Sequence, residues 1–167
     1  MPIPVYILCS ESGAEDKETR RFSHFHVIEQ INVARLSEAS GQVWLVPSLQ
    51  FQAVALWARE DSDGPEQEFE FRWLVRLPKG EEMVVHTGKF RFQSRLQRIV
   101  LTGGGNLFQT PGEFSVQCHI RPVGATEADW MIQKYSFPIV EVALPASPMA
   151  SNTPRPNSVD TTQSPEN

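Results

Sequence analysis

The clearest pattern in the chain is an alternation of apolar and polar residues within residues 66–77. The apolar positions are Phe69, Phe71, Trp73, Val75 and Leu77, and the polar positions between them are Glu68, Glu70, Arg72 and Arg76. Successive side chains of a β-strand point to opposite faces, so a period of two predicts a strand with one buried and one solvated face. Only Leu74 breaks the polar side. We expect a half-buried strand with Trp73 in the core.

A second stretch repeats this pattern after the turn Pro111-Gly112. Its apolar positions are Phe114, Val116, Cys118 and Ile120, and polar residues stand between them. Two separate segments with the same period predict an all-β protein of antiparallel strands that each bury one face.

Shorter patterns place the remaining strands. We expect them at residues 3–9, 22–33, 48–57, 84–92, 96–101 and 130–142. The polar turn 60–65 joins two strands, so residues 48–77 are expected to form a hairpin. The charged run 10–20 is expected to be a surface loop, and residues 102–106 a flexible one.

Three places interrupt these patterns. Glu29 falls out of phase within residues 22–33, which favours a bulge or a sheet edge there. Pro138 has no N–H to donate, so it favours an edge or a bulge in the last strand. Residues 35–46 are compatible with a short helix.

The number and spacing of the strands define the expected fold class. Strands joined at short intervals are typical of sandwiches and barrels, and buried aromatic residues with long polar loops favour a two-sheet antiparallel β-sandwich. We expect one such domain at residues 2–142. Residues 143–167 are rich in Pro, Ser, Thr and Asn and have too few apolar side chains to offset the entropy of ordering. This tail is expected to be disordered and dispensable for folding.

The charge balance narrows the range of partners. Among 167 residues, 15 Lys and Arg stand against 20 Asp and Glu, which gives a formal net charge of −5. This charge provides no general attraction for nucleic acid or anionic membranes, so neither is expected as a partner. No apolar run approaches the length of a membrane span, and the stretch 5–9 is too short for a signal peptide. The expected location is the cytoplasm.

Cys9 and Cys118 each lie among strand residues rather than in a Cys-x-x-Cys pair. Cysteine is among the residues most often buried, so we interpret both as buried free thiols. A disulfide between them is the alternative, because the first and a late strand of a sandwich can be neighbours. A reducing cytoplasm favours the thiols.

Two histidines suggest a rival, catalytic interpretation. His24 and His26 stand two residues apart in an expected strand, which places their Cα atoms about 6.5 to 7 Å apart on one face. Two imidazoles at this spacing can bind one metal ion, with a third ligand from His86 or His119. The sequence leaves open a metal-dependent hydrolase that uses His24 and His26, beside the interpretation of both as polar or edge-strand residues.

Other catalytic and cofactor motifs are incomplete. The turn 61–64 resembles the start of a calcium loop, but Pro65 cuts it short. The glycines at 103–105 are not followed by the Gly-Lys-Ser/Thr of a phosphate loop. No serine or cysteine stands in a recognisable nucleophile motif. We therefore expect no cofactor, and the chain is not expected to be an enzyme.

Four basic residues form a candidate binding surface. Arg72 and Arg76 share the outer parity of one expected strand, and Lys89 and Arg91 that of the next. If the two strands are adjacent, these residues make a basic sheet face, partly offset by glutamates on the first strand. Such a face would bind an anion or an acidic partner, and the alternative is a solvated face of mixed charge.

Segments near the two ends of the expected domain resemble a known family. Residues 6–9 read Tyr-Ile-Leu-Cys, and residues 107–114 read Leu-Phe-Gln-Thr-Pro-Gly-Glu-Phe. In these segments the chain resembles a family of uncharacterised bacterial domains with a Leu-Cys-Asp-type opening and a Phe-x-x-Pro-Gly-x-Tyr-type turn. Ser10 and Glu11 stand here in place of the acidic residue, and Phe114 in place of the tyrosine. The resemblance implies a C2-like β-sandwich over residues 3–142, but no activity and no site residues.

These observations give one functional expectation. A C2-like or immunoglobulin-like sandwich of about eight strands presents its loops on a rigid scaffold, and Glu29 and Pro138 mark strands expected at sheet edges. We expect a non-catalytic interaction module that binds a protein partner, or another macromolecule, through loops or an exposed sheet edge.

Overall fold

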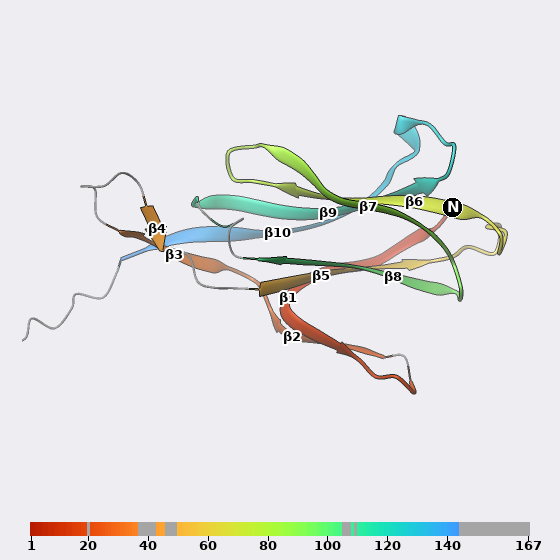
Figure 1. Ribbon diagram of the computed structural model, residues 1–167, viewed down its shortest axis with the longest axis horizontal. Coiled ribbons are helices and arrows are strands. Elements are labelled where there is room, and N and C mark those ends of the chain that lie inside the picture. The colour runs from red at the N-terminus through yellow and green to blue at the C-terminus, as the bar shows by residue number, and fades with distance from the viewer. Residues whose placement is uncertain (20, 37–42, 46–49, 105–107, 109, 144–167) are drawn as a thin grey trace, which may run out of the picture.

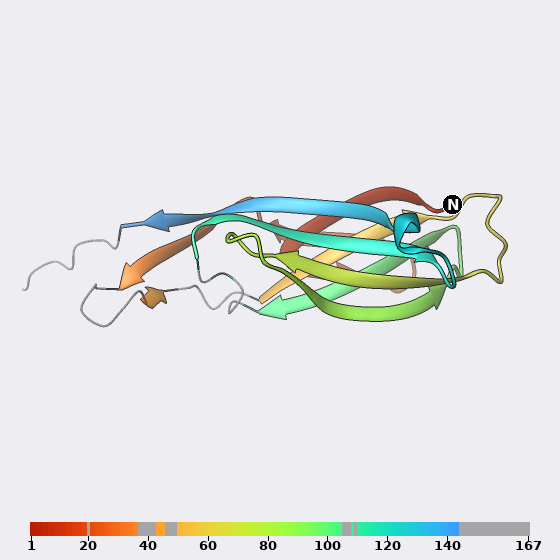
Figure 2. The ribbon, with the colours of Figure 1, turned by 90° about the horizontal axis from the view of Figure 1, so that it is seen from above.

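The computed structural model describes residues 1–19, 21–36, 43–45, 50–104, 108 and 110–143. The predicted tail lies outside the described residues except for Ala143. In the described part, ten strands form two sheets that pack face to face (Figures 1 and 2). The predicted all-β class is confirmed.

The first sheet, sheet A, has four strands and the second, sheet B, has six. The order in sheet A is β2 (Phe22–Val27), β1 (Ile3–Glu15), β5 (Gln50–Ala58) and β8 (Leu96–Gly104). The order in sheet B is β4 (Val43–Leu45), β3 (Ile31–Leu36), β10 (Met131–Val142), β9 (Gly112–Pro122), β6 (Glu68–Arg76) and β7 (Glu82–Arg91). A short 3-10 helix, η2 (Glu127–Asp129), precedes β10.

The core lies between the two sheets and follows the predicted parity. Trp73, Val75 and Phe69 on β6 are fully buried, and so are Val116 and Ile120 on β9. Their polar neighbours in sequence lie on the outer face of sheet B. The apolar positions of β6 and β9 thus face the core and the polar positions between them face outward. The parity predicted for both strands is confirmed.

The predicted hairpin at 48–77 is wrong. β5 pairs with β1 and β8 in sheet A, whereas β6 pairs with β7 and β9 in sheet B. The connection between β5 and β6 therefore crosses from one sheet to the other. Both strands have apolar residues on their inner faces. Packing of the two strands in opposite sheets buries these residues as well as pairing in a hairpin would.

The strand pairs are antiparallel as predicted except for one, because β3 runs parallel to β10. The expected strand 22–33 is in fact two strands, β2 in sheet A and β3 in sheet B, so the expected interruption near Glu29 is a crossing between sheets. His26, just before the crossing, has a left-handed backbone (φ 55°), which ends the simple period of two. The Tyr135 hydroxyl donates to the Ile28 carbonyl (2.9 Å) and fixes the crossing.

Three expected loops or helices are strands. The run 10–15 continues β1 and pairs with β2, so β1 and β2 form a two-stranded ribbon that leaves the body of sheet A (Figure 1). Gly103 and Gly104 belong to β8 and pair with β5. Residues 43–45, within the segment compatible with a helix, form β4. Charge and glycine content favour loops, but cross-strand pairing overrides both here.

Pro138 lies inside sheet B rather than in an edge strand. β10 pairs with β9 at Pro138, and its pairing with β3 begins only at Ile139. Pro138 therefore has a strand neighbour on one side only, which is where a missing N–H does no harm. The predicted edge is wrong for the strand as a whole but matches this one position.

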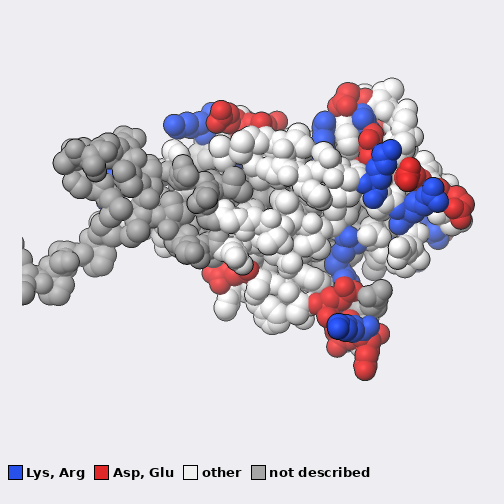
Figure 3. All heavy atoms as spheres, in the orientation of Figure 1, with Lys and Arg blue, Asp and Glu red and all other residues white. Residues whose placement is uncertain are grey.

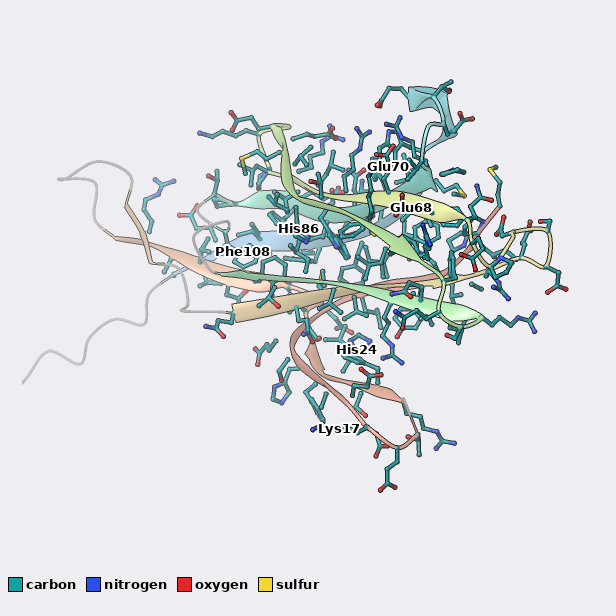
Figure 4. All side chains as sticks on the ribbon, turned by 45° about the vertical axis from the view of Figure 1, so that its right-hand side comes forward. Lys17, His24, Glu68, Glu70, His86 and Phe108 are labelled. Carbon is teal, nitrogen blue, oxygen red and sulfur yellow. The ribbon has the colours of Figure 1, made fainter. Side chains whose placement is uncertain are left out.

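Phe108 is fully buried at one end of the core (Figure 4). Its ring centroid lies 5.5 Å from that of Phe51 in sheet A and 5.1 Å from that of Phe114 in sheet B. Such tilted and edge-to-face aromatic pairs contribute beyond their buried area. Phe108 thus links the two sheets.

Gly103 is expected to be intolerant of a side chain. It lies opposite Phe51, and a Cβ at this position would approach the Phe51 ring to 2.3 Å. Gly103→Ala should lower the free energy of unfolding by about 1 to 3 kcal/mol, measured by chemical denaturation, because the buried ring must shift. The matched control is Gly104→Ala, where a Cβ meets no atom within 4 Å. Equal losses in the two variants would contradict the proposed contact.

Candidate functional site

The structure brings together the four residues of the predicted basic face, but not as a basic surface. Arg72 and Arg76 lie on β6, and Lys89 and Arg91 lie next to them on β7. Each cross-strand neighbour of Lys89, Arg91 and Arg76 is a glutamate: Glu70, Glu68 and Glu82, respectively. On the face shown in Figure 3, basic and acidic side chains intermix in most of the charged regions. The arrangement corresponds to the alternative of a mixed-charge face.

The most organised cluster on this face was missed by sequence reasoning. The guanidinium carbons of Arg72 and Arg121 lie 4.3 and 4.2 Å from the centroid of the Trp130 ring. The Trp130 indole N–H donates to Glu127 of η2 (3.0 Å), and Arg121 pairs with both Glu127 (3.0 Å) and Glu70. We call these five residues the Trp130 cluster. The sequence predicts Trp130 only as the start of a strand, because its partners come from β6, β9 and η2.

The Trp130 cluster is electrically balanced, with two arginines and two glutamates. The hydrogen bond from Trp130 is the main cause that lowers the pKa of Glu127, and the bond to Glu70 is the main cause that raises the pKa of Arg121. Each guanidinium is already matched by a carboxylate and a ring face. We conclude that the cluster fastens η2 to the outer face of sheet B and leaves no uncompensated charge for an anionic ligand.

His119 lies beneath this cluster on β9 and is only 5% exposed. The Arg72 Nε–H donates to its Nδ1 (3.3 Å), and its Nε2–H donates to the Gln117 side-chain oxygen (2.9 Å). These bonds fit the neutral ring, because a protonated Nδ1 would direct an N–H at the Arg72 donor. Burial, followed by the charge of Arg72, lowers the pKa of His119 to about 4.

The two histidines of the rival interpretation have separate partners. His24 Nδ1 lies 3.4 Å from the Ser10 hydroxyl and its Nε2 lies 3.4 Å from the Tyr6 hydroxyl. His26 pairs instead with Glu11 (3.0 Å) and is exposed. Figure 4 shows His24 on the β1–β2 ribbon and His86 on β7, in different parts of the molecule. Within the described ranges, no group of three His, Cys, Asp or Glu residues is placed to hold a metal ion.

Cys9 and Cys118 are both free and buried, so the interpretation as buried thiols is confirmed. Burial raises the pKa of each thiol to about 12. A thiolate is the reactive form of cysteine, so neither residue is suited to act as a nucleophile.

The remaining candidate is the free edge of β7. β7 ends sheet B and β8 ends sheet A, and Figure 2 shows them along one side of the molecule, with β1 and β10 along the other. Three consecutive apolar side chains of β7 are exposed: Met83 (38%), Val84 (54%) and Val85 (39%). We call the outer side of Glu82–Arg91 the β7 edge. The sequence offered the signal, an apolar run in a charged neighbourhood, but did not show that this strand is last in its sheet.

Comparisons with known proteins leave the class of the chain open. No family model matches the sequence, and no curated protein shows significant similarity to it. Among the described residues, no helix is both long enough and apolar enough to cross a membrane.

Proposed function

We propose that this protein is a non-catalytic interaction module that binds a protein partner by strand addition at the β7 edge. The observation that carries this proposal is the exposure of Met83, Val84 and Val85 on the last strand of sheet B. An edge strand presents a row of unpaired N–H and C=O groups, and an added strand pairs with them.

The composition of the β7 edge supports this choice. Edge strands that avoid association usually carry charged residues or prolines at their centre. The centre of β7 is instead apolar, and charged residues lie near its two ends, Glu82 on one side and Lys89 with Arg91 on the other. An added strand would bury the apolar centre and leave the charges at the rim, which is the usual layout of a protein interface.

The finer class of the fold is part of the same proposal. We propose a C2-like or immunoglobulin-like sandwich, related to the bacterial family that the segments 6–9 and 107–114 resemble. Support comes from the burial of Phe108 between the sheets and from the start of β9 at Gly112, the glycine of the Pro-Gly turn. The two free thiols support a reducing compartment such as the cytoplasm.

Site-specific photo-crosslinking in cells of the native host tests the proposed function. A photo-reactive amino acid at Val84 should give a covalent adduct with another polypeptide. The matched control is Ile132, which has the same exposed fraction, 54%. It lies on β10, which β9 and β6 separate from β7. The absence of an adduct at Val84, or equal adducts at both positions, would overturn the proposal.

A further inference from the structure

We infer that the partner at the β7 edge is a second copy of this chain, so that two β7 strands pair antiparallel about a two-fold axis and join two B sheets. This inference rests on the proposed function, because it specifies the occupant of the same edge. The interface is symmetric: each β7 residue of one copy lies opposite a defined β7 residue of the other copy.

The charges of β7 are complementary to themselves. Glu82 lies opposite Arg76 of β6, and Lys89 lies opposite Glu70, so both side chains are on the outer face of sheet B. Lys89 follows Glu82 by seven positions, an odd offset that would normally place the two side chains on opposite faces of the strand. The register shift opposite Trp73 and Leu74 brings them to the same face.

One antiparallel register of two β7 strands forms the pair of Glu82 and Lys89 twice. With the two-fold axis between Val85 and His86, Glu82 of each copy lies opposite Lys89 of the other. Lys89 has no ion pair within the part of the chain that the structure describes, and Glu82 has only a distant one to Arg76 (4.0 Å). Both charges are therefore available, and a second copy supplies the matching charges in the required order.

The apolar centre matches in the same register. Val84 lies opposite Thr87, and Val85 lies opposite His86. Met83 lies opposite Gly88, which has no side chain to compete for the space. The three exposed apolar side chains thus meet small or flat partners, and no cross-strand pair within β7 brings like charges together.

The β8 edge offers no comparable self-pairing. Its exposed apolar residues, Leu96 and Val100, are separated along the strand. Its one charged residue, Arg98, pairs with Glu15 of the β1–β2 ribbon (3.0 Å). β8 carries no acidic residue for a second copy of Arg98 to meet, so β7 is the edge that favours a second copy.

A charge-exchange series measured by sedimentation tests this inference. The purified full chain should show a concentration-dependent monomer–dimer equilibrium. Lys89→Glu or Glu82→Lys places like charges opposite each other twice, and each should weaken dimerisation at least about tenfold. The double variant Glu82→Lys, Lys89→Glu reverses both pairs and should restore dimerisation. Lys17→Glu, at the tip of the β1–β2 ribbon (Figure 4), makes the same change in net charge as Lys89→Glu and should leave the dimer intact.

The outcomes separate this inference from the proposed function. If the wild-type chain stays monomeric at all concentrations, the inference of a second copy at the β7 edge is overturned. A double variant that is folded by circular dichroism but does not dimerise overturns it as well. If a variant does not fold, mapping the Val84 crosslink decides: an adduct joining two β7 segments supports the dimer, and an adduct with a different protein overturns it while the interaction function stands. No adduct overturns the interaction function itself.

Discussion

Replacement of Trp73 with alanine is expected to lower the free energy of unfolding by about 3 to 5 kcal/mol, the range observed when large buried aromatic residues are truncated. Trp73 is fully buried on β6, which lies between β7 and β9 in sheet B. Its removal leaves a cavity that the two packed sheets can fill only in part. Urea denaturation followed by circular dichroism would measure the loss.

Two companion variants make this result specific. Trp73→Phe keeps most of the buried apolar surface and should cost clearly less than alanine. Arg76→Ala changes the outer face of the same strand, where the side chain is half exposed (52%), and should change stability by less than about 0.5 kcal/mol. Similar losses for Arg76→Ala and Trp73→Ala would show that the assignment of inner and outer faces is wrong.

The second large effect is a loss of stability in mild acid that originates at His119. In the unfolded chain, its imidazole has an ordinary pKa near 6.5, whereas in the folded protein burial lowers the pKa to about 4. Between these values the unfolded state binds more protons, so stability falls as the pH is lowered from about 6.5 to about 4. The loss should amount to about 2 to 3 kcal/mol.

The variant His119→Gln tests the origin of this effect. Glutamine can accept the hydrogen bond from Arg72 but does not titrate, so the variant should lose less stability than the wild type over the same pH window. Part of the loss should remain, because burial also lowers the pKa of His24. An NMR titration of the His119 ring gives a direct check. A ring that protonates near pH 6.5 in the folded protein would contradict the prediction.

Local alternation predicted most of the strands because it depends on one physical fact, that a strand in a packed sheet has two unlike faces. The segments around Trp73 and Phe114 illustrate this, since each exposes the polar parity and buries the apolar one. Sheet membership could not be predicted in the same way. β5 and β6 follow each other in sequence and have the same pattern, yet they lie in different sheets.

The two missed boundaries at the start of the chain have a common cause. β1 bends from sheet A into the ribbon with β2, and the chain then crosses to sheet B after His26. Neither change involves a proline or glycine at the turning point. They are determined by contacts made later in the chain, such as the bond from Tyr135 to Ile28. No local pattern records such contacts.

In the candidate sites, too, the sequence predicts which face a side chain lies on but not which strands are adjacent. Sequence reasoning identified the outer positions of Arg72 and Lys89, because these follow from parity. It left open whether this face is basic or of mixed charge, because the pairing that places a glutamate beside Arg76, Lys89 and Arg91 depends on sheet order. Trp130 contacts two arginines only because the segment between η2 and β10 lies against β6 and β9.

The parallel pairing of β3 with β10 has a consequence for how the chain acquires its fold. β3 can pair with β10 only after β10 has been synthesised, roughly a hundred residues later in the chain. Contacts between residues so far apart in sequence slow folding. Until β10 emerges from the ribosome, the apolar residues Ile31 and Val33 have no completed sheet to cover them. The nascent chain is therefore most exposed to misassociation late in synthesis, and removal of the last strand should leave β3 without the strand that joins it to the rest of sheet B.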